Sequence, residues 1–415
     1  MFRPLLALAA FLATSYSLTF NLLSYGGVGD GLTDNTAAFR AAVAAVAAAS
    51  GGTLLVPSGT FKTRAFNLTS SMTLFLDSGA TIQSSLDYSA WPLTGPLRAY
   101  PLDGQRYSPL IGGYGLQGVR LLGNASAARR PVIDGLGLAW DAASSAKLLH
   151  GQRPHAIELA GTTGIEIAHL SVVEAAYWSI HFSECTDVHF HDAEVTAATE
   201  NGDGCDIGAQ NVLLERLHIA TADDAIAIKS GDAPAGSGLP PSRNITIRDS
   251  TLASGEGCIA IGSEMTAGVE DVAVANVTCA AAGHALLYIK ERRLAGGYVR
   301  NVTVRDSSIS GLAHRALWLS QHFGETGENA PLGLVLPVLA NVTLRNIGVV
   351  AGGGVLQAAL LNGTGPAGPD GAGGITGLLL ENVDLGRPAQ GWTCVNASGV
   401  WRNVTPAPCS EITPE

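Results

Sequence analysis

The sequence predicts an all-β chain folded as a solenoid of stacked strands. Short runs rich in β-branched residues recur along the chain, each after a turn residue, and each alternates apolar and polar residues with the period of a strand. No amphipathic helix separates these runs, and the 51 glycines provide for many tight turns. The first runs recur at a nearly constant spacing that is typical of β solenoids.

The repeat is clearest between residues 165 and 342. Seven runs begin there, the first three at close and nearly equal intervals and the later ones at longer intervals. Their starts are Ile165, Val188, Val212, Ile245, Val272, Val302 and Val342. The longer intervals indicate loops inserted near residues 232–243, 321–337 and 362–375. A β-propeller would need about 40–50 residues for each blade, and a leucine-rich repeat would show regular Leu and Asn positions.

One helix is expected near the N-terminus. Asp34 or Asn35 can cap it, the Ala-rich segment 36–49 can form it, and Gly51-Gly52 can end it. Such a helix would cover the open end of the first coil and block the addition of further strands. No linker divides the remainder, so residues 18–415 are expected to form a single domain.

Residues 1–17 resemble a signal peptide. Arg3 precedes an apolar run from Pro4 to Ala13, and small residues follow as far as Ser17. That run is about half of the ~20 residues needed to span a bilayer, and no later stretch of that length lacks polar residues. We therefore expect a secreted protein, extracellular or in a cell wall, without a membrane anchor.

Sequons and cysteines agree with secretion. Nine Asn-x-Ser/Thr sequons predict a glycoprotein; they lie at Asn67, Asn124, Asn244, Asn276, Asn301, Asn341, Asn362, Asn396 and Asn403. Six cysteines allow up to three disulfides in an oxidising compartment. Cys394 and Cys409 form the simplest pair, because they close a local loop. The alternative that Cys205 and Cys258 are buried free thiols stays open.

Composition excludes some classes of partner. The formal net charge of −11 argues against nucleic acid, whose binding needs a basic surface. No Cys-x-x-Cys or His-x-x-x-His pair offers the ligand spacing of a zinc site. We therefore expect no metal and no cofactor, and a monomer.

Acidic residues recur at the spacing of the rungs. Asp203 stands about one rung before Asp223 and Asp224, and His181 stands about one rung before Asp203. Side chains one period apart stack at ~4.8 Å, so these four are expected to gather on one face. Later rungs of that face would carry Glu256 and then Lys290. Carboxylates held close together raise the pKa of at least one of them, as a general acid requires, while an ionised neighbour can activate water.

Four short motifs follow one another through the middle of the chain. They are Asn201-Gly-Asp203-Gly-Cys-Asp206, Asp223-Asp224-Ala-Ile-Ala-Ile-Lys229-Ser-Gly231, Gly255-Glu256-Gly257-Cys-Ile-Ala-Ile-Gly-Ser-Glu264-Met and Tyr288-Ile-Lys290. In this order they resemble the motifs of the polygalacturonases, glycoside hydrolase family 28. The segment from Phe20 to Thr36 and the element Trp178-Ser-Ile-His181 are similar to further parts of that family, and Gly296-Gly297-Tyr298 resembles its plant-type branch. The resemblance spans roughly residues 18–350.

This resemblance implies a right-handed parallel β-helix of the pectin-lyase-like kind and inverting hydrolysis of α-1,4-galacturonosyl linkages in pectic polysaccharide. It implies that Asp223 is the general acid and that Asp203 and Asp224 activate the attacking water. Inverting enzymes hold these carboxyl groups ~6.5–9.5 Å apart. Substrate would be bound by the remaining candidates, with Lys290 on the substrate carboxylate: Lys290, Asn201, His181, Glu256, Tyr288 and Lys229.

The chain departs from the family's pattern at three positions. Glu256 stands where the family usually has His, Tyr288 where it has Arg, and Ala225 where it has Cys. An added carboxylate repels an anionic galacturonate unless it is protonated or paired, for example with Lys290 or Lys229. The departures lead to the hypothesis that the pocket accepts a less charged sugar, in rhamnose-containing or methyl-esterified pectin.

Three other functions stay open. One is a rhamnogalacturonan-type hydrolase, and another is an inactive family member that binds wall polysaccharide. The third is a lyase of the same architecture, which would hold Ca²⁺ between its aspartates and release an unsaturated sugar that a hydrolase does not produce.

Overall fold

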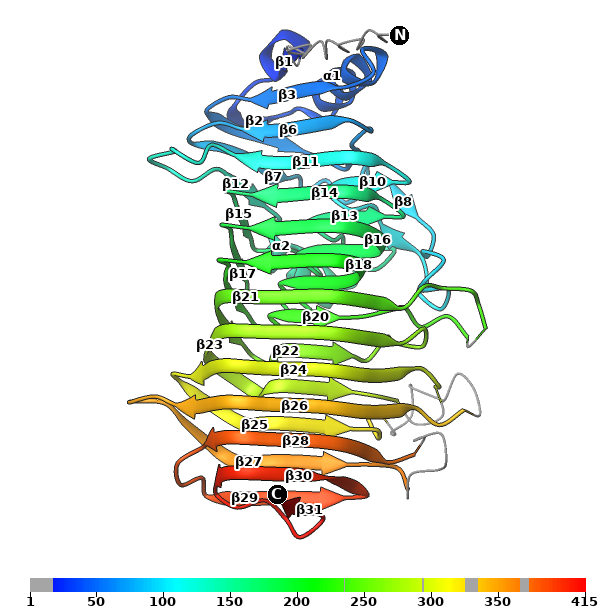
Figure 1. The fold of residues 1–415 in the computed structure, drawn as a ribbon. Coiled ribbons are helices and arrows are strands. Elements are labelled where there is room, and N and C mark those ends of the chain that lie inside the picture. The colour runs from blue at the N-terminus through cyan, green and yellow to red at the C-terminus, as the bar shows by residue number, and fades with distance from the viewer. Residues whose placement is uncertain (1–17, 235, 293–294, 325–334, 366–372) are drawn as a thin grey trace, which may run out of the picture.

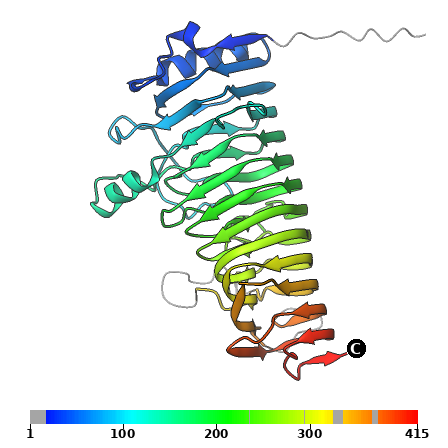
Figure 2. The same ribbon diagram turned by 90° about the vertical axis from the view of Figure 1, so that its left-hand side faces the viewer.

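The chain folds into one long stack of β coils. A computed structural model describes residues 18–234, 236–292, 295–324, 335–365 and 373–415. The coils follow one another from the N-terminal to the C-terminal end in chain order (Figure 1), and the quarter-turned view shows the same elongated stack (Figure 2). The predicted signal peptide, residues 1–17, lies outside the described residues. The predicted right-handed parallel β-helix is confirmed.

Each coil contributes strands to three parallel ladders. The first ladder later forms the floor of the candidate site; it contains β5 (Phe66–Asn67), β10 (Ile111–Tyr114), β13 (Ile157–Ala160), β16 (Ile180–His191), β18 (Cys205–Glu215), β20 (Ile226–Ile228), β22 (Gly257–Gly262), β23 (Val269–Lys290), β25 (Leu312–Ser320), β27 (Gly354–Asn362) and β29 (Gln390–Val395).

The second ladder shares the long bent strands β16, β18 and β23 with the first. Its other members are β1 (Thr19–Asn21), β3 (Gly52–Val56), β6 (Met72–Leu76), β11 (Gln117–Gly123), β14 (Thr163–Ala168), β21 (Ser242–Ser254), β24 (Tyr298–Ile309), β26 (Val338–Val349), β28 (Ile375–Asp384), β30 (Ala397–Thr405) and β31 (Ile412–Pro414).

The third ladder begins with short strands and continues into β21, β23 and β24. The short strands are β2 (Asp30–Asp34), β4 (Gly59–Thr63), β7 (Ala80–Ser84), β12 (Val132–Asp134), β15 (Ser171–Val173), β17 (Glu194–Ala197) and β19 (His218–Thr221). A separate antiparallel pair, β8 (Leu93–Thr94) and β9 (Arg106–Tyr107), stands beside the coils.

The predicted repeat coincides with the stacking of the second ladder. Ile165 pairs with Val188, Val188 with Val212, and the register continues through every predicted start as far as Val342. All seven side chains are buried, so they form one apolar column inside the coils. Stacking of identical positions is favourable because each branched side chain packs on the one a rung below.

A helix closes the N-terminal end, as the sequence predicts. Helix α1 spans Thr36–Ala48, one residue shorter than expected, and Oδ1 of Asp34 accepts a hydrogen bond from the Thr36 amide at 2.9 Å. Phe39 of the helix stacks on Phe66 of the coil below at 4.5 Å between ring centroids. The short helices η1 (Leu22–Tyr25) and α2 (Gly137–Ser145) were not predicted from the sequence. Among the described residues, no helix is both long and apolar enough to cross a membrane.

Asparagines and aspartates form ladders at the turns between strands. Asn301 and Asn341 both have left-handed backbone, and the Asn341 side-chain amide donates to Oδ1 of Asn301 at 3.2 Å. Asn244, Asn276 and Asn403 donate to the preceding rung in the same way. Several predicted glycosylation sites are therefore also hydrogen-bonding residues of the turns.

The disulfide prediction is partly confirmed. Cys394 and Cys409 are bonded, and Cys258 is bonded to Cys279 on the next rung, with Cα atoms 6.0 Å apart. Cys205 is a buried free thiol, as one alternative held, but Cys258 is not. Cys185 is also free and buried, so two disulfides form rather than three.

Candidate active site

Three aspartates meet where strands of the first ladder begin. Asp203 precedes β18, and Asp223 and Asp224 precede β20 on the next rung. The register pairs Cys205 with Ile226, so Asp203 stacks on Asp224. A carboxylate oxygen of each aspartate lies within 4.8 Å of the other two. The gathering of these three side chains, predicted from their spacing, is present in the structure.

The bend before β20 lets adjacent aspartates face the same space. In a regular strand Asp223 and Asp224 would point to opposite sides. Here Oδ1 of Asp223 accepts the Asp224 amide at 2.8 Å, and Ser254 on the next rung donates its hydroxyl to the Asp223 carbonyl at 2.6 Å. These contacts hold the bend, which turns both carboxylates toward Asp203.

Lys290 forms an ion pair with Asp224 two rungs away. Its Nζ lies 2.5 Å from Oδ2 of Asp224, while Oδ1 accepts the Gly257 amide at 3.0 Å. A side chain at position 257 would crowd this contact, because a Cβ there would lie 3.2 Å from Oδ1 and 3.0 Å from Cβ of Tyr288. The glycine of the third motif therefore allows its amide to approach the carboxylate.

A second buried lysine holds the other side of the cluster. Nζ of Lys229 lies 2.8 Å from Oε2 of Glu264, 3.5 Å from Oδ1 of Asp206 and 4.0 Å from Oδ2 of Asp203. The same ammonium group sits 4.5 Å above the ring of Trp178. Arg292 also contacts Glu264, at 3.0 Å.

Carboxyl groups outnumber cations in this cluster, and their pKa values shift accordingly. Burial, and then the charge of Asp206, raise the pKa of Asp203 well above its ordinary value. Burial likewise raises the pKa of Asp206 to about 8, although Lys229 opposes the shift. Burial and the neighbouring Asp224 raise the pKa of Asp223. The cluster therefore retains protons, which general acid catalysis requires.

The groove above the cluster has a cavity volume of about 330 Å³, which is within the range of ligand sites. Of the predicted residues, it is lined by Asn201, Asp203, Asp223, Lys229, Glu256 and Lys290. Asp224 lies beneath this surface and is fully buried.

His181 and Tyr288 are placed differently from these residues. The register aligns His181 with Asp206 rather than with Asp203, the first aspartate of the same motif. Tyr288 is 2% exposed and stacks on Trp318, with ring centroids 4.7 Å apart. Neither of these two predicted substrate-binding side chains is among the residues that line the groove.

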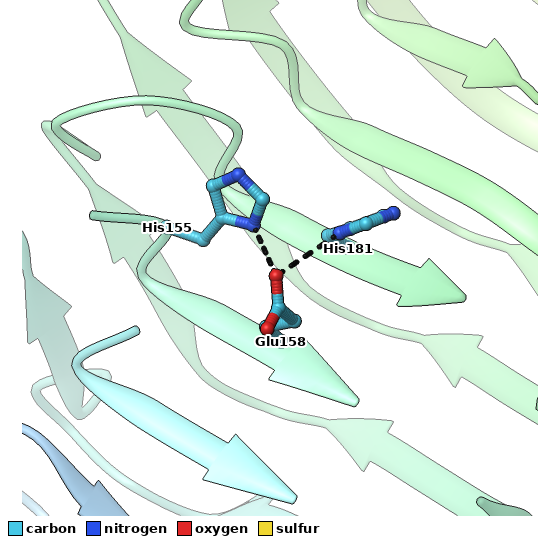
Figure 3. Close-up of side chains that lie close together, drawn as sticks. All are labelled: His155, Glu158 and His181. Atoms are coloured by element: carbon cyan, nitrogen blue, oxygen red, sulfur yellow. Dashed lines mark hydrogen bonds and ion pairs between the residues drawn. The ribbon is translucent and has the colours of Figure 1, made fainter. Parts of the chain in front are cut away.

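His181 belongs to a buried cluster around Glu158 (Figure 3). Oε2 of Glu158 lies 2.9 Å from Nδ1 of His155 and 3.4 Å from Nδ1 of His181. Arg106 contacts both carboxylate oxygens, and the Tyr114 hydroxyl donates to Oε1 at 2.9 Å. Burial lowers the pKa of His181 to about 4, so this imidazole is neutral. A neutral His181 donates through Nδ1 to the carboxylate.

Four groups among the described residues have the composition of a cation site, and two of them lie in or behind the candidate site. Each of these two already contains a protein cation. Arg106 contacts the same Glu158 carboxylate that His155 and His181 approach. In the aspartate cluster, Lys290 contacts Asp224. A metal ion at either place would have to displace or repel these groups, so the donor sets do not fit a metal.

Six further residues line the groove that were not among the predicted site residues. They are Tyr177, Trp178, Ser263, Glu264, Arg292 and Phe323. The spacing of residues could have identified Glu264. Val212 pairs with Ile245 across one long rung, and a similar length of chain separates Lys229 from Glu264. A buried lysine needs such a carboxylate partner.

His284, which is not among the predicted site residues, is the partner of Glu256. Gly257 pairs with Ala285, so His284 stands beside Glu256, and the two side chains are in contact. The pairing of Glu256 with Lys290 or Lys229, considered from the sequence, is not what the structure shows. A β-bulge between Leu252 and Ala253 shifts the register by one residue and hides this neighbour from simple spacing.

Known proteins resemble this chain over most of its length. Residues 52–366 match the family model described as glycosyl hydrolases family 28. A probable polygalacturonase of Vitis vinifera is 31% identical over 409 residues, which cover 94% of this chain and 80% of that protein. An exopolygalacturonase of Thermotoga maritima has a similar fold (TM-score 0.71, 23% identity, 88% of this chain and 87% of that one). So does a polygalacturonase of Erwinia carotovora (TM-score 0.73, 19% identity, 93% and 97%). The extent of these matches shows that the chain belongs to glycosyl hydrolases family 28.

Proposed function

We propose that this protein hydrolyses α-1,4-galacturonosyl linkages in pectic polysaccharide with inversion at the anomeric carbon. The observation that supports it best is the gathering of Asp203, Asp223 and Asp224 at one groove, where Asp203 and Asp223 line the surface and Asp224 lies just beneath it in contact with Lys290. A pair of carboxyl groups with different protonation states is what glycoside hydrolysis needs. The relatives named above are polygalacturonases, which supports a pectic substrate.

The aspartates have distinct roles in this proposal. Asp223, whose pKa burial and Asp224 raise, gives its proton to the leaving glycosidic oxygen. Asp224, ion-paired with Lys290, takes a proton from the attacking water. Asp203, whose pKa is also raised, orients that water rather than carrying the charge of the base. Lys290 has donors to spare and binds a substrate carboxylate beside Asp224.

Asn201 and Lys229 complete the site in this proposal. Asn201 lines the groove on a residue with left-handed backbone, where its amide can reach a sugar hydroxyl. Lys229 is held by Glu264 and fixes Asp203 and Asp206 in place. His181 and Tyr288 act from behind the groove. His181 packs against Trp178, and Tyr288 stacks on Trp318.

We also propose that the protein is secreted and acts as a monomer on cell-wall polymers. The signal-peptide character of residues 1–17 supports secretion. Expression of the full chain in a secreting host should release a protein whose N-terminus begins near Leu18, which N-terminal sequencing can check. A product retained in the cell with Met1 intact would contradict this.

The activity is tested by incubating the protein with a panel of pectic polymers and measuring new reducing ends. We expect turnover by the wild-type chain and its loss in Asp223→Asn and in Asp203→Asn, with unchanged circular dichroism. Asp87→Asn, at an exposed turn away from the groove, serves as the control and should retain activity. A product with the ultraviolet absorbance of an unsaturated uronide would instead identify a lyase, and binding without any product would identify an inactive wall-binding protein.

A further inference from the structure

One wall of the groove carries a histidine–carboxylate contact that the proposed chemistry does not use. Glu256 precedes β22 and lines the groove with Asp223 and Lys290. His284 stands on the next rung of the first ladder, and its amide donates to the Glu256 carbonyl at 2.7 Å. The imidazole and the carboxylate are in contact, and each side chain remains about one-third exposed, at 31% and 34%. The pair is therefore both fixed by the ladder and accessible to a ligand.

Aromatic rings lie directly behind this pair. The His284 ring is 5.1 Å from Trp318 in an edge-to-face arrangement, and 5.2 Å from Tyr288. Tyr288 stacks on Trp318, and Phe323 packs against the same cluster while also lining the groove. Aromatic faces attract the weakly positive C–H groups of a sugar ring and repel an anion, because the ring face carries the negative part of the quadrupole.

Among the described residues, the cations near this wall already have protein partners. Lys290 contacts Asp224, and Arg292 contacts Glu264. Arg315 lies 4.1 Å over the Trp318 ring and donates to Gln357 at 2.7 Å. Among the described residues, a substrate carboxylate that contacts Glu256 rather than Lys290 would therefore meet a like charge without a further uncommitted cation beside it.

We propose that Glu256, held by His284, selects an uncharged sugar residue at the position next to the aspartate cluster. This inference rests on the proposed function and names its substrate class more narrowly. The ligand chemistry is a pyranose ring without a free carboxylate, either a neutral sugar in the backbone or a methyl-esterified galacturonate. Glu256 accepts hydrogen bonds from the hydroxyl groups of that ring, and the ring's C–H face lies toward the aromatic side chains. A galacturonate in the free acid form is disfavoured by its charge.

The substitution Glu256→Gln tests this, because it removes the charge and keeps the size and the hydrogen-bonding oxygen. Three substrates are compared at equal chain length: de-esterified polygalacturonate, its fully methyl-esterified form, and a polymer alternating rhamnose with galacturonate. We expect the wild-type chain to prefer either the methyl-esterified polymer or the polymer that contains neutral rhamnose, and this preference identifies the source of the uncharged ring. In Glu256→Gln, kcat/KM on de-esterified polygalacturonate should rise ~10-fold, with little change on the preferred substrate.

Glu166→Gln is the matched control. Glu166 is 30% exposed and also contacts a histidine on the next rung, His191, but it lies on the second ladder, away from the groove. Its substitution should leave the ratio of kcat/KM values between the three substrates unchanged. The preference should also weaken as salt is added, since the discrimination is electrostatic.

A binding measurement separates this inference from the proposed hydrolysis. The Asp223→Asn chain, with and without Glu256→Gln, is titrated by calorimetry with short oligogalacturonides and with their methyl esters. We expect the chain with Glu256 to bind the methyl ester more tightly than the free acid. In the Glu256→Gln chain, the two dissociation constants should become nearly equal. An unchanged ratio overturns the selection by Glu256, whether or not the wild-type chain shows turnover. If the ratio of dissociation constants changes but the wild-type chain shows no turnover, only the proposed hydrolysis is overturned.

Discussion

Nζ of Lys290 lies 2.5 Å from Oδ2 of Asp224, a residue 66 positions earlier in the chain. Both groups are buried, and the pair crosses an intervening rung that carries Gly257, whose amide binds the other carboxylate oxygen. Burial alone would lower the pKa of Lys290, but Asp224 raises it above the ordinary lysine value, so the ammonium form persists. This contact connects the second and fourth sequence motifs.

Removal of the ammonium group should disable the site. In Lys290→Met the Asp224 carboxylate loses its cation and remains buried, which costs about 3–5 kcal/mol of unfolding free energy and should lower kcat by ~100-fold or more. Urea unfolding and initial rates on the preferred polymer measure the two effects. Lys147→Met, at an exposed position, should change neither. A variant with normal kcat would show that Lys290 has no part in the reaction.

The stereochemistry of the product tests the aspartate roles. The nearest oxygens of Asp203, Asp223 and Asp224 lie within 4.8 Å of one another, closer than the ~6.5–9.5 Å expected between carboxyl groups of an inverting enzyme. We nevertheless expect inversion. In the proposed roles, the ion pair with Lys290 keeps Asp224 as the base that activates water, so no aspartate is left to attack the anomeric carbon as a nucleophile. Proton NMR of an early reaction should show the β-anomer first. Initial α-anomer would mean retention, with an aspartate as nucleophile.

Glu291, next to Lys290, makes stability depend on pH. Its side chain is fully buried, and burial raises its pKa from 4.5 to about 8, with a small opposing effect from Gln321. The folded state therefore binds more protons than the unfolded state between these values, so this group removes stability as the pH rises through that window, by up to roughly 4–5 kcal/mol.

Glu291→Gln removes that penalty. Its melting temperature should exceed that of the wild type at about pH 8, and the two should converge near pH 4.5 and below. Only the difference between the two chains is compared, because Asp206 and Asp232, whose pKa values are raised to about 8 and about 6, titrate in both. A constant difference across this range would contradict the assigned shift.

The Glu158 cluster should be required for stability rather than for chemistry. Glu158→Gln leaves the Arg106 guanidinium buried without its counter-charge, so we expect a loss of about 3–5 kcal/mol in unfolding free energy. Glu166→Gln removes a half-exposed pair with Arg120 and should cost less than about 1 kcal/mol. Guanidinium unfolding of both variants measures the contrast. If Glu158→Gln kept full stability, the buried contacts in Figure 3 would not be a structural anchor.

Much of the fold could be read from the sequence because a β solenoid repeats its environment. The column from Ile165 to Val342 is visible as spaced apolar starts, and each of them occupies the same place on its rung. The gathering of Asp203, Asp223 and Asp224 followed from the same arithmetic. Helix α1 was readable from its composition and from the acidic residue before it.

Tertiary structure decided what lies beside those residues. Register shifts and loop insertions lengthen the rungs unequally, so His181 aligns with Asp206 and His284 with Glu256, while Glu264 meets Lys229 through an ion pair. Burial raises the pKa of Asp203, and Tyr288 is buried behind the groove. In both cases the burial depends on side chains from distant segments. The repeat in the sequence therefore determined which side chains share a face. Only the folded coils determined which of them touch, because register depends on every inserted residue and desolvation on everything packed above the site.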